Sequence, residues 1–114
     1  MKYDKELFVK HLQGMVQIPT VSSADPEKTR VEEFLKLHAY LEEAYPLVHK
    51  TFTREVIGKC GLLYTWKGTG KSDKLPLLMT AHQDVVPEGD HSMWKYPPFS
   101  AYVDEEGILW GRGC

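Results

Sequence analysis

Two side chains that could hold a metal ion stand two residues apart in this sequence, at His82 and Asp84. They follow a short, almost wholly apolar run, residues 75–81, which is typical of a buried central strand. Because residues i and i+2 of a strand point to the same side, we expect both side chains together at its carboxyl end, where open α/β sheets build their sites. Imidazole binds metal through one ring nitrogen, and a nearby carboxylate fixes its tautomer. A salt-bridged or hydrogen-bonded histidine at a strand end would explain the same spacing, so the motif alone leaves both interpretations open.

The other histidines are weaker candidates for metal binding. His11 and His38 fall on or near expected helix faces, where packing or surface roles are more common. His49 lies in an expected edge strand, and His91 lies in an expected loop. Each of the four is therefore expected to have a structural or surface role and not to bind a metal ion.

The composition narrows the class of protein. The 114 residues fit one domain, and a net charge of −2 removes the usual electrostatic case for binding nucleic acid or anionic lipid. No apolar run approaches the ~18 residues of a membrane span, and no signal-peptide core is visible at the N-terminus. Two cysteines, Cys60 and Cys114, make no disulfide framework. The expected location is therefore the cytoplasm.

The spacing of apolar residues predicts two helices followed by strands. The first helix is expected over residues 4–16 with Asp4 as its cap, and the second from a capping Asp25 to the break at Pro46. A period of two then predicts strands at about 47–57, 62–66 and 75–81, an irregular stretch at 85–98, and a hairpin of 101–103 with 108–110. Together these elements predict an α/β domain in which two N-terminal helices pack on a mixed β-sheet.

Three motifs, in order, resemble the M20 family of zinc peptidases. Residues 77–87, LLMTAHQDVVP, resemble the first metal motif of that family. WKYPPFS at 94–100 and GILWGRG at 107–113 follow in the expected order and spacing. The opening helix with IPTVS at 18–22 is similar to the family's start, and GLLYTW at 61–66 is most similar to the carboxypeptidase S branch, which includes enzymes acting on N-acyl amino acids. The resemblance covers essentially the whole chain.

This resemblance implies a role for each site residue. His82 would bind one of two zinc ions, and Asp84 would be the active-site carboxylate that orients His82. The family hydrolyses peptide or N-acyl amide bonds of small substrates and releases an amino acid. Residues 1–114 would then be the N-terminal portion of a metallopeptidase catalytic domain, without the rest of that domain or the dimerisation domain. In the family, an Asp that bridges both metals follows the Gly-Arg-Gly motif by a few residues, whereas this sequence ends at Cys114.

With one ligand assigned, these residues are expected to bind zinc weakly at most and to have no hydrolase activity, because a catalytic zinc keeps three protein ligands. Two alternatives stay open: a complete, non-enzymatic binding module that uses the 85–98 loop for recognition, and an M20-like pseudoenzyme that retains His82 and Asp84. Without the rest of the domain, the strand at 75–81 would lose cover on a face or an edge. Self-association into a homo-oligomer is therefore expected.

Overall fold

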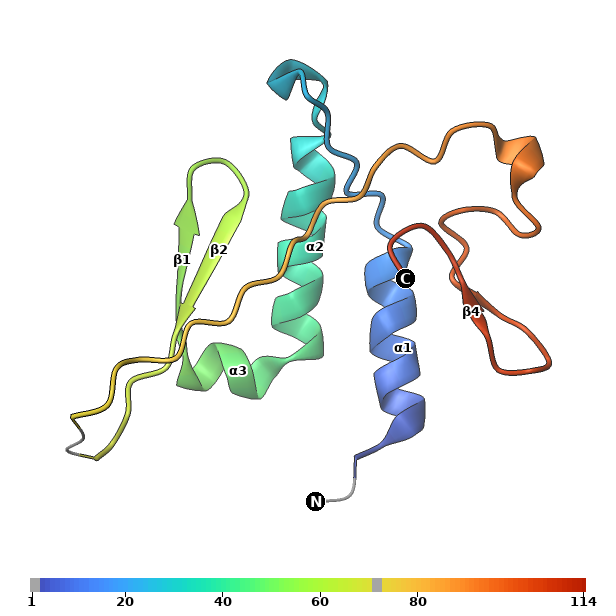
Figure 1. Cartoon of the computed structure of the whole chain (residues 1–114). Helices are drawn as coiled ribbons and strands as arrows, with labels where there is room; N and C mark the ends of the chain where they lie inside the picture. The colour runs from blue at the N-terminus through green and yellow to red at the C-terminus, as the bar shows by residue number, and fades with distance from the viewer. Residues whose placement is uncertain (1–2, 71–72) are drawn as a thin grey trace.

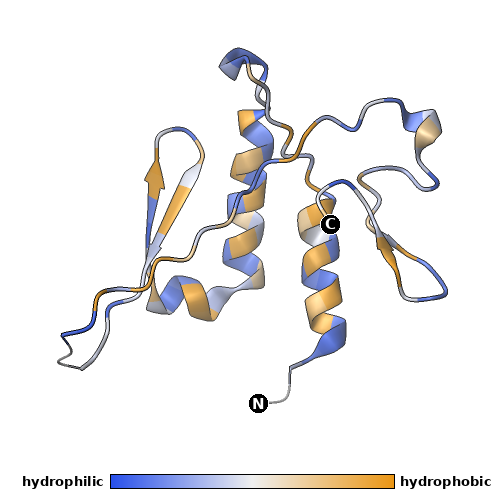
Figure 2. Ribbon diagram, in the orientation of Figure 1, coloured by the Kyte–Doolittle hydropathy of each residue, from blue (hydrophilic) through white to orange (hydrophobic). Residues whose placement is uncertain are grey.

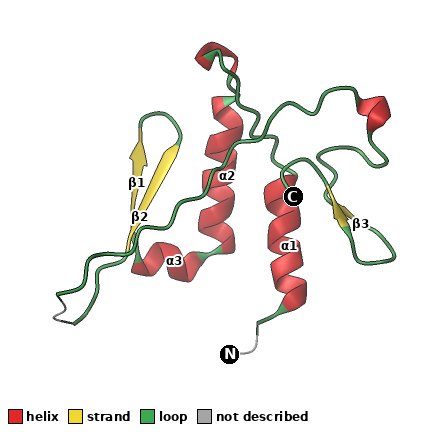
Figure 3. Ribbon diagram, in the orientation of Figure 1, coloured by secondary structure: helices red, strands yellow, loops and turns green. Residues whose placement is uncertain are grey.

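The computed structural model describes residues 3–70 and 73–114 (Figure 1). The described elements are, in chain order, α1 (Lys5–Val16), η1 (Pro26–Lys28), α2 (Val31–Ala44), α3 (Pro46–Thr51), β1 (Thr53–Ile57), β2 (Gly61–Thr65), η2 (His91–Met93), β3 (Tyr102–Val103) and β4 (Leu109–Trp110). Figure 3 shows that long irregular connections join these elements after β2. The predicted combination of helices and strands is confirmed. The predicted mixed sheet is wrong, because the described strands form two separate two-stranded antiparallel sheets.

The two predicted helices form, but the second begins later than expected. α1 starts after Asp4, whose carboxylate accepts a hydrogen bond from the backbone N–H of Leu7 at 3.1 Å. Asp25 caps only the single 3-10 turn η1, and its carboxylate accepts from the backbone N–H of Glu27. Thr29 then adopts an extended backbone conformation, so the helical path is interrupted and α2 begins at Val31.

α1 and α2 lie side by side, and a glycine allows their close approach (Figure 1). A Cβ added at Gly14 of α1 would lie 2.1 Å from the hydroxyl oxygen of Tyr40 of α2. That hydroxyl donates to the carbonyl oxygen of His11 at 3.3 Å. The buried residues of this region come from both helices and from two irregular segments: Val16, Thr20, Val21, Phe34, Leu37, His38, Pro98 and Ala101. The core is therefore small, and the helices provide much of it.

The strand predicted at 47–57 is correct only in its second half. Pro46 lies after the end of α2 and is also the first residue of the helix α3. Proline fits the first turn of a helix because no N–H is needed there. His49 therefore lies in a helix and not in an edge strand. Its Nδ1 lies 2.9 Å from the carbonyl oxygen of Tyr45, and its Nε2 lies 2.9 Å from the hydroxyl oxygen of Tyr64. β1 and β2 then pair as an antiparallel hairpin, close to the predicted positions.

The central strand predicted at 75–81 is absent from the described structure. This segment is irregular and makes no backbone–backbone hydrogen bond with the described residues. Its large apolar side chains are 78–91% exposed: Leu75, Leu77, Leu78 and Met79. In Figure 2 the hydrophobic residues of this segment, in orange, lie on an irregular stretch of ribbon that belongs to no helix or strand. The prediction failed because an apolar run becomes a strand only where a neighbouring strand supplies backbone partners.

The whole chain is correspondingly extended. Its Cα radius of gyration is 16.8 Å, whereas a compact domain of this length has a radius of about 13 Å. The predicted C-terminal hairpin does form, and Tyr102 of β3 pairs with Trp110 of β4. Among the described residues, no helix combines the length and the apolar character that crossing a membrane requires.

We expect the chain to self-associate through the exposed segment at 75–81, because bare apolar side chains and unpaired backbone groups favour contact with another chain. Leu77→Glu should shift sedimentation-velocity profiles toward the monomer, since burying the new charge in a contact is costly. Met93→Glu is the matched control, because Leu77 and Met93 are 87% and 83% exposed. A wild-type chain that stays monomeric at high concentration contradicts this expectation.

Candidate functional site

The structure brings His82 and Asp84 together, although no strand presents them. The Nδ1 atom of His82 lies 3.3 Å from Oδ1 of Asp84 and 2.8 Å from the carbonyl oxygen of the same residue. Two acceptors around Nδ1 place the imidazole proton on that atom. No described residue forms a hydrogen bond to Nε2 of His82, whose side chain is 84% exposed. This arrangement leaves Nε2 as the atom that can bind a metal ion.

Ser22 is a third member of this site, and sequence reasoning assigned it no chemistry. Its hydroxyl donates to Oδ2 of Asp84 at 2.6 Å, so the two carboxylate oxygens have different partners. This hydrogen bond is the main reason why the pKa of Asp84 lies below its usual range. Partial burial opposes it, while the backbone N–H of Asp84 and the His82 ring lower the pKa further. Asp84 is therefore ionised at neutral pH, and its carboxylate can accept a hydrogen bond from the ring of His82.

Backbone contacts with residues 20–22 hold the site segment in place. Val21 and Val85 form an isolated parallel bridge. The N–H of Val85 donates to the carbonyl oxygen of Thr20 at 2.9 Å, and the N–H of Ser22 donates to that of Val85 at 3.1 Å. An isolated bridge between one residue of each segment thus takes the place of the predicted strand end. The signal in the sequence was the IPTVS motif at 18–22, but its spacing gave no reason to place it beside Asp84.

A pocket of about 340 Å³ opens beside His82 and Asp84. α1 and α2 supply apolar walls that include Leu12 and Leu37, while the polar side chains of the site line another part. Arg112 also lines this pocket, and its guanidinium lies 4.8 Å from the centre of the Trp94 ring. The buried Nε of Arg112 has no hydrogen-bond partner among the described residues.

The Gly-Arg-Gly motif reaches the pocket because both of its glycines allow close approach. A Cβ at Gly111 would lie 2.4 Å from a methyl carbon of Val16, so α1 leaves no room for a side chain there. Gly113 has φ +104°, a conformation that favours glycine, and a Cβ there would lie 2.8 Å from a methyl carbon of Val85. The contact at Gly113 brings the third sequence motif against the first, and both motifs line the same pocket.

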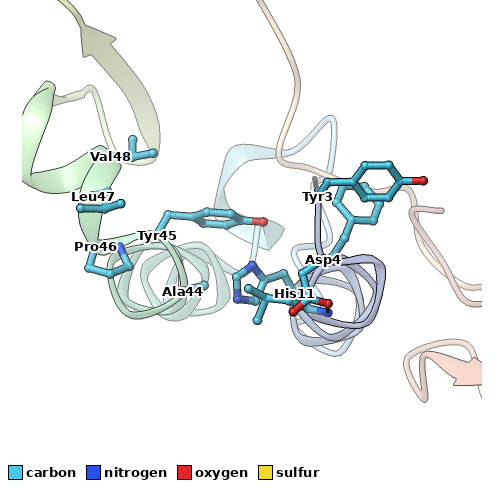
Figure 4. A pocket seen from close by; sticks show the side chains of 10 residues that line it. Tyr3, Asp4, His11, Ala44, Tyr45, Pro46, Leu47 and Val48 are labelled. Carbon is cyan, nitrogen blue, oxygen red and sulfur yellow. Dashed lines mark hydrogen bonds between the residues drawn. The ribbon is translucent and has the colours of Figure 1, made fainter. Parts of the chain in front are cut away.

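A second pocket, of about 350 Å³, lies between the N-terminal part of α1 and the junction of α2 and α3 (Figure 4). Figure 4 shows the rings of His11 and Tyr45 close together in its lining, and their centres are 4.7 Å apart in an edge-to-face contact. Its lining is mostly apolar, and its one carboxylate, Asp4, is engaged as the cap of α1. It shares no lining residue with the pocket at His82.

Of the remaining histidines and cysteines, His38 and Cys60 contact the site segment, and both do so through the Gln83 side chain. His38 is buried and contacts Gln83. The ring of His91 lies 3.3 Å from a carboxylate oxygen of Glu88, and both cysteines are free thiols. Within residues 3–70 and 73–114, no group of three or more His, Cys, Asp or Glu side chains is arranged to hold a metal ion. The described residues therefore offer a single donor atom suited to a metal ion, Nε2 of His82, and not a complete set of ligands.

Comparison with known proteins finds relatives along nearly the whole chain. Carboxypeptidase S of Saccharomyces cerevisiae is 42% identical over 113 residues, which cover 92% of this chain and 19% of that protein. N-fatty-acyl-amino acid synthase/hydrolase PM20D1 is 38% identical in Bos taurus, over 90% of this chain and 20% of the relative. The Xenopus tropicalis protein of that name is 33% identical, over 96% of this chain and 21% of its own length.

The chain thus spans about a fifth of the length of the curated relatives that it matches. No family model matches it. No solved structure matches it significantly.

Removing the Ser22 hydroxyl should raise the pKa of Asp84 toward its ordinary value of 3.8, because that hydrogen bond is the largest cause of the lowering. A group with a lowered pKa stabilises the fold above its ordinary pKa, and this contribution is lost as the pH falls through the lowered value. Ser22→Ala should therefore lose stability at neutral pH, and this loss should fade in acid.

An NMR titration of the Asp84 carboxyl carbon, together with denaturant unfolding at several pH values, measures both effects. Ser23→Ala is the matched control, because the Ser23 hydroxyl oxygen accepts from the backbone N–H of Asp25 and does not contact Asp84. An unchanged Asp84 titration in Ser22→Ala would rule out the role given to this hydroxyl.

Proposed function

The chain belongs to the M20 family as a homologue of the N-terminal fifth of carboxypeptidase S and PM20D1, and we propose that His82 is its zinc ligand. We propose that the chain is the first part of a zinc-dependent exopeptidase or amidase. The whole enzyme would hydrolyse peptide or N-acyl amide bonds and release an amino acid. The carrying observation is the geometry of His82, whose Nδ1 faces Asp84 while Nε2 has no described partner.

Each residue of the site has a part in this proposal. His82 would hold zinc through Nε2. Asp84 keeps the imidazole proton on Nδ1, and a carboxylate in this position makes the other nitrogen a stronger ligand. Ser22 orients the Asp84 carboxylate and keeps it ionised through its 2.6 Å hydrogen bond. Zinc, when bound, polarises a carbonyl oxygen and lowers the pKa of a bound water.

The substrate class is proposed from the relatives' names. PM20D1 is named as a synthase and hydrolase of N-fatty-acyl-amino acids, and the yeast relative is named as a carboxypeptidase. We propose small peptides or N-acyl amino acids as substrates of the enzyme that contains this chain. These names favour an enzyme over the alternative of a non-enzymatic binding module.

In the full-length enzyme of which we propose this chain to be a part, His82→Ala should remove one of two zinc ions. Release of an amino acid from an N-acyl amino acid should fall below detection, because the remaining ligands would hold one metal incompletely. Asp84→Asn should lower zinc affinity or activity by about 10–100-fold, the usual effect of losing an orienting carboxylate. Metal analysis by mass spectrometry and an amino-acid release assay measure the two effects.

His91→Ala is the matched control, since His91 is also an exposed histidine but its contact is with Glu88. It should leave zinc content and activity unchanged. If His82→Ala retains both the zinc stoichiometry and the activity of the wild type, His82 is not a zinc ligand.

The isolated 114-residue chain should not hydrolyse these substrates, even with added zinc. The proposal assigns one zinc ligand to it, whereas a catalytic zinc keeps three protein ligands and an open position. Incubating the pure chain with zinc and an N-acyl amino acid, and measuring the free amino acid by chromatography, tests this. Zinc-dependent release that is abolished by His82→Ala would overturn the expectation.

A further inference from the structure

We propose that Gln83, which stands between the two site residues, is the positioning residue that fixes the His82–Asp84 pair. Its side chain clamps the site segment to α2 and to the β1–β2 turn. The inference deepens the proposed function, since the pair it positions is the one assigned to zinc, but its geometric content concerns only the residues of this chain.

The side-chain amide of Gln83 joins two elements that are far from it in the sequence. Its Oε1 lies 2.9 Å from Nε2 of His38 in α2, and its Nε2 donates to the carbonyl oxygen of Cys60 at 2.9 Å. Because an amide oxygen only accepts, His38 donates from Nε2. His38 is 5% exposed, so this contact is made inside the fold. Both ends of one amide are therefore used, each by a different element.

The main chain of the same residue has a third anchor. The hydroxyl of Thr20 donates to the carbonyl oxygen of Gln83 at 2.7 Å, and Thr20 is 3% exposed. Gln83 is thus held by the segment at 20–22, by α2 and by the turn that contains Cys60. The preceding segment at 75–81 makes no backbone–backbone hydrogen bond with the described residues and cannot hold His82 in place.

The contact between His82 and Asp84 depends on the backbone at residue 83. Nδ1 of His82 reaches both a carboxylate oxygen and the carbonyl oxygen of Asp84, across one intervening residue. The φ and ψ angles of that residue decide whether these atoms meet, because they set the relative direction of its two neighbours. Anchors on both the side chain and the main chain of Gln83 restrict those angles. The clamp therefore sets which ring nitrogen of His82 carries the proton.

Few other side chains could replace this amide. Methionine is similar in length but offers neither a donor nor a comparable acceptor, so it would leave His38 and the Cys60 carbonyl unpaired. Glutamate can accept from His38 but cannot donate to the Cys60 carbonyl when ionised. The two substitutions thus remove both contacts or one of them.

The tautomer of His82 in the 114-residue chain tests the proposal. Nitrogen-15 NMR at about pH 8.5, where imidazoles are neutral, distinguishes a proton on Nδ1 from one on Nε2. The wild type should hold the proton on Nδ1. Gln83→Met should lower the ratio of Nδ1–H to Nε2–H forms by about tenfold, the order expected when His82 loses its hydrogen bond to the Asp84 carbonyl oxygen. Gln83→Glu, which retains the contact with His38 but loses the one with the Cys60 carbonyl oxygen, should also lower the ratio.

Gln17→Met is the matched control, because Gln17 also donates its side-chain amide to a carbonyl oxygen, that of Ser100, at 3.3 Å. It should leave the His82 ratio unchanged. Circular dichroism of each variant verifies that the helices are retained, and if Gln83→Met does not fold, the Gln83→Glu ratio decides.

The outcomes separate this inference from the proposed function. If the wild type holds the proton on Nδ1 and neither Gln83 variant changes the ratio, the clamp is wrong and the zinc proposal stands. If the wild type holds the proton on Nε2, the site geometry fails and both are overturned. If the tautomer responds as expected while the His82→Ala enzyme keeps its zinc, the clamp stands and the zinc assignment fails.

Discussion

The candidate site depends on one small backbone contact, the parallel bridge between Val21 and Val85. This bridge brings Ser22 to the Asp84 carboxylate and Thr20 to the Gln83 carbonyl. Together with the contacts of the Gln83 side chain, it separates the residues around His82 from the open path of the preceding segment. Its two backbone hydrogen bonds do in this chain what a full sheet does in larger α/β sites, which is to give two side chains a fixed separation.

The parts that sequence reasoning predicted well are those that local interactions determine. The cap at Asp4 and the C-terminal hairpin each depend on residues that are close in the sequence. The strand at 75–81 and the mixed sheet could not be decided locally, since a strand exists only with a partner. His82 and Asp84 do lie together, but the strand from which their pairing was predicted is absent from the described structure. Ser22 and the contacts of Gln83 were not predictable, because they join residues 62 and 45 positions apart.

The exposed segment at 75–81 has an energetic meaning beyond its shape. Burying a leucine or methionine side chain stabilises a fold by roughly 1.5–3 kcal/mol. Leu75, Leu77, Leu78 and Met79 are 78–91% exposed and contribute little of this. Net stabilities of small domains are commonly only about 5–15 kcal/mol, so such a loss is a large fraction. The covered part of the chain, around α1 and α2, therefore provides most of what holds the site.

The distance along the chain between the members of the site also orders its formation in time. Ser22 and Asp84 are separated by 62 residues, and closing a loop of that length costs roughly 4 kcal/mol of chain entropy. Two hydrogen bonds recover only about 1 kcal/mol each. Helices and the β1–β2 hairpin need no such closure and form on microsecond timescales or faster. The His82 site is therefore expected to form late in folding, after α1 and α2 have packed and placed residues 20–22.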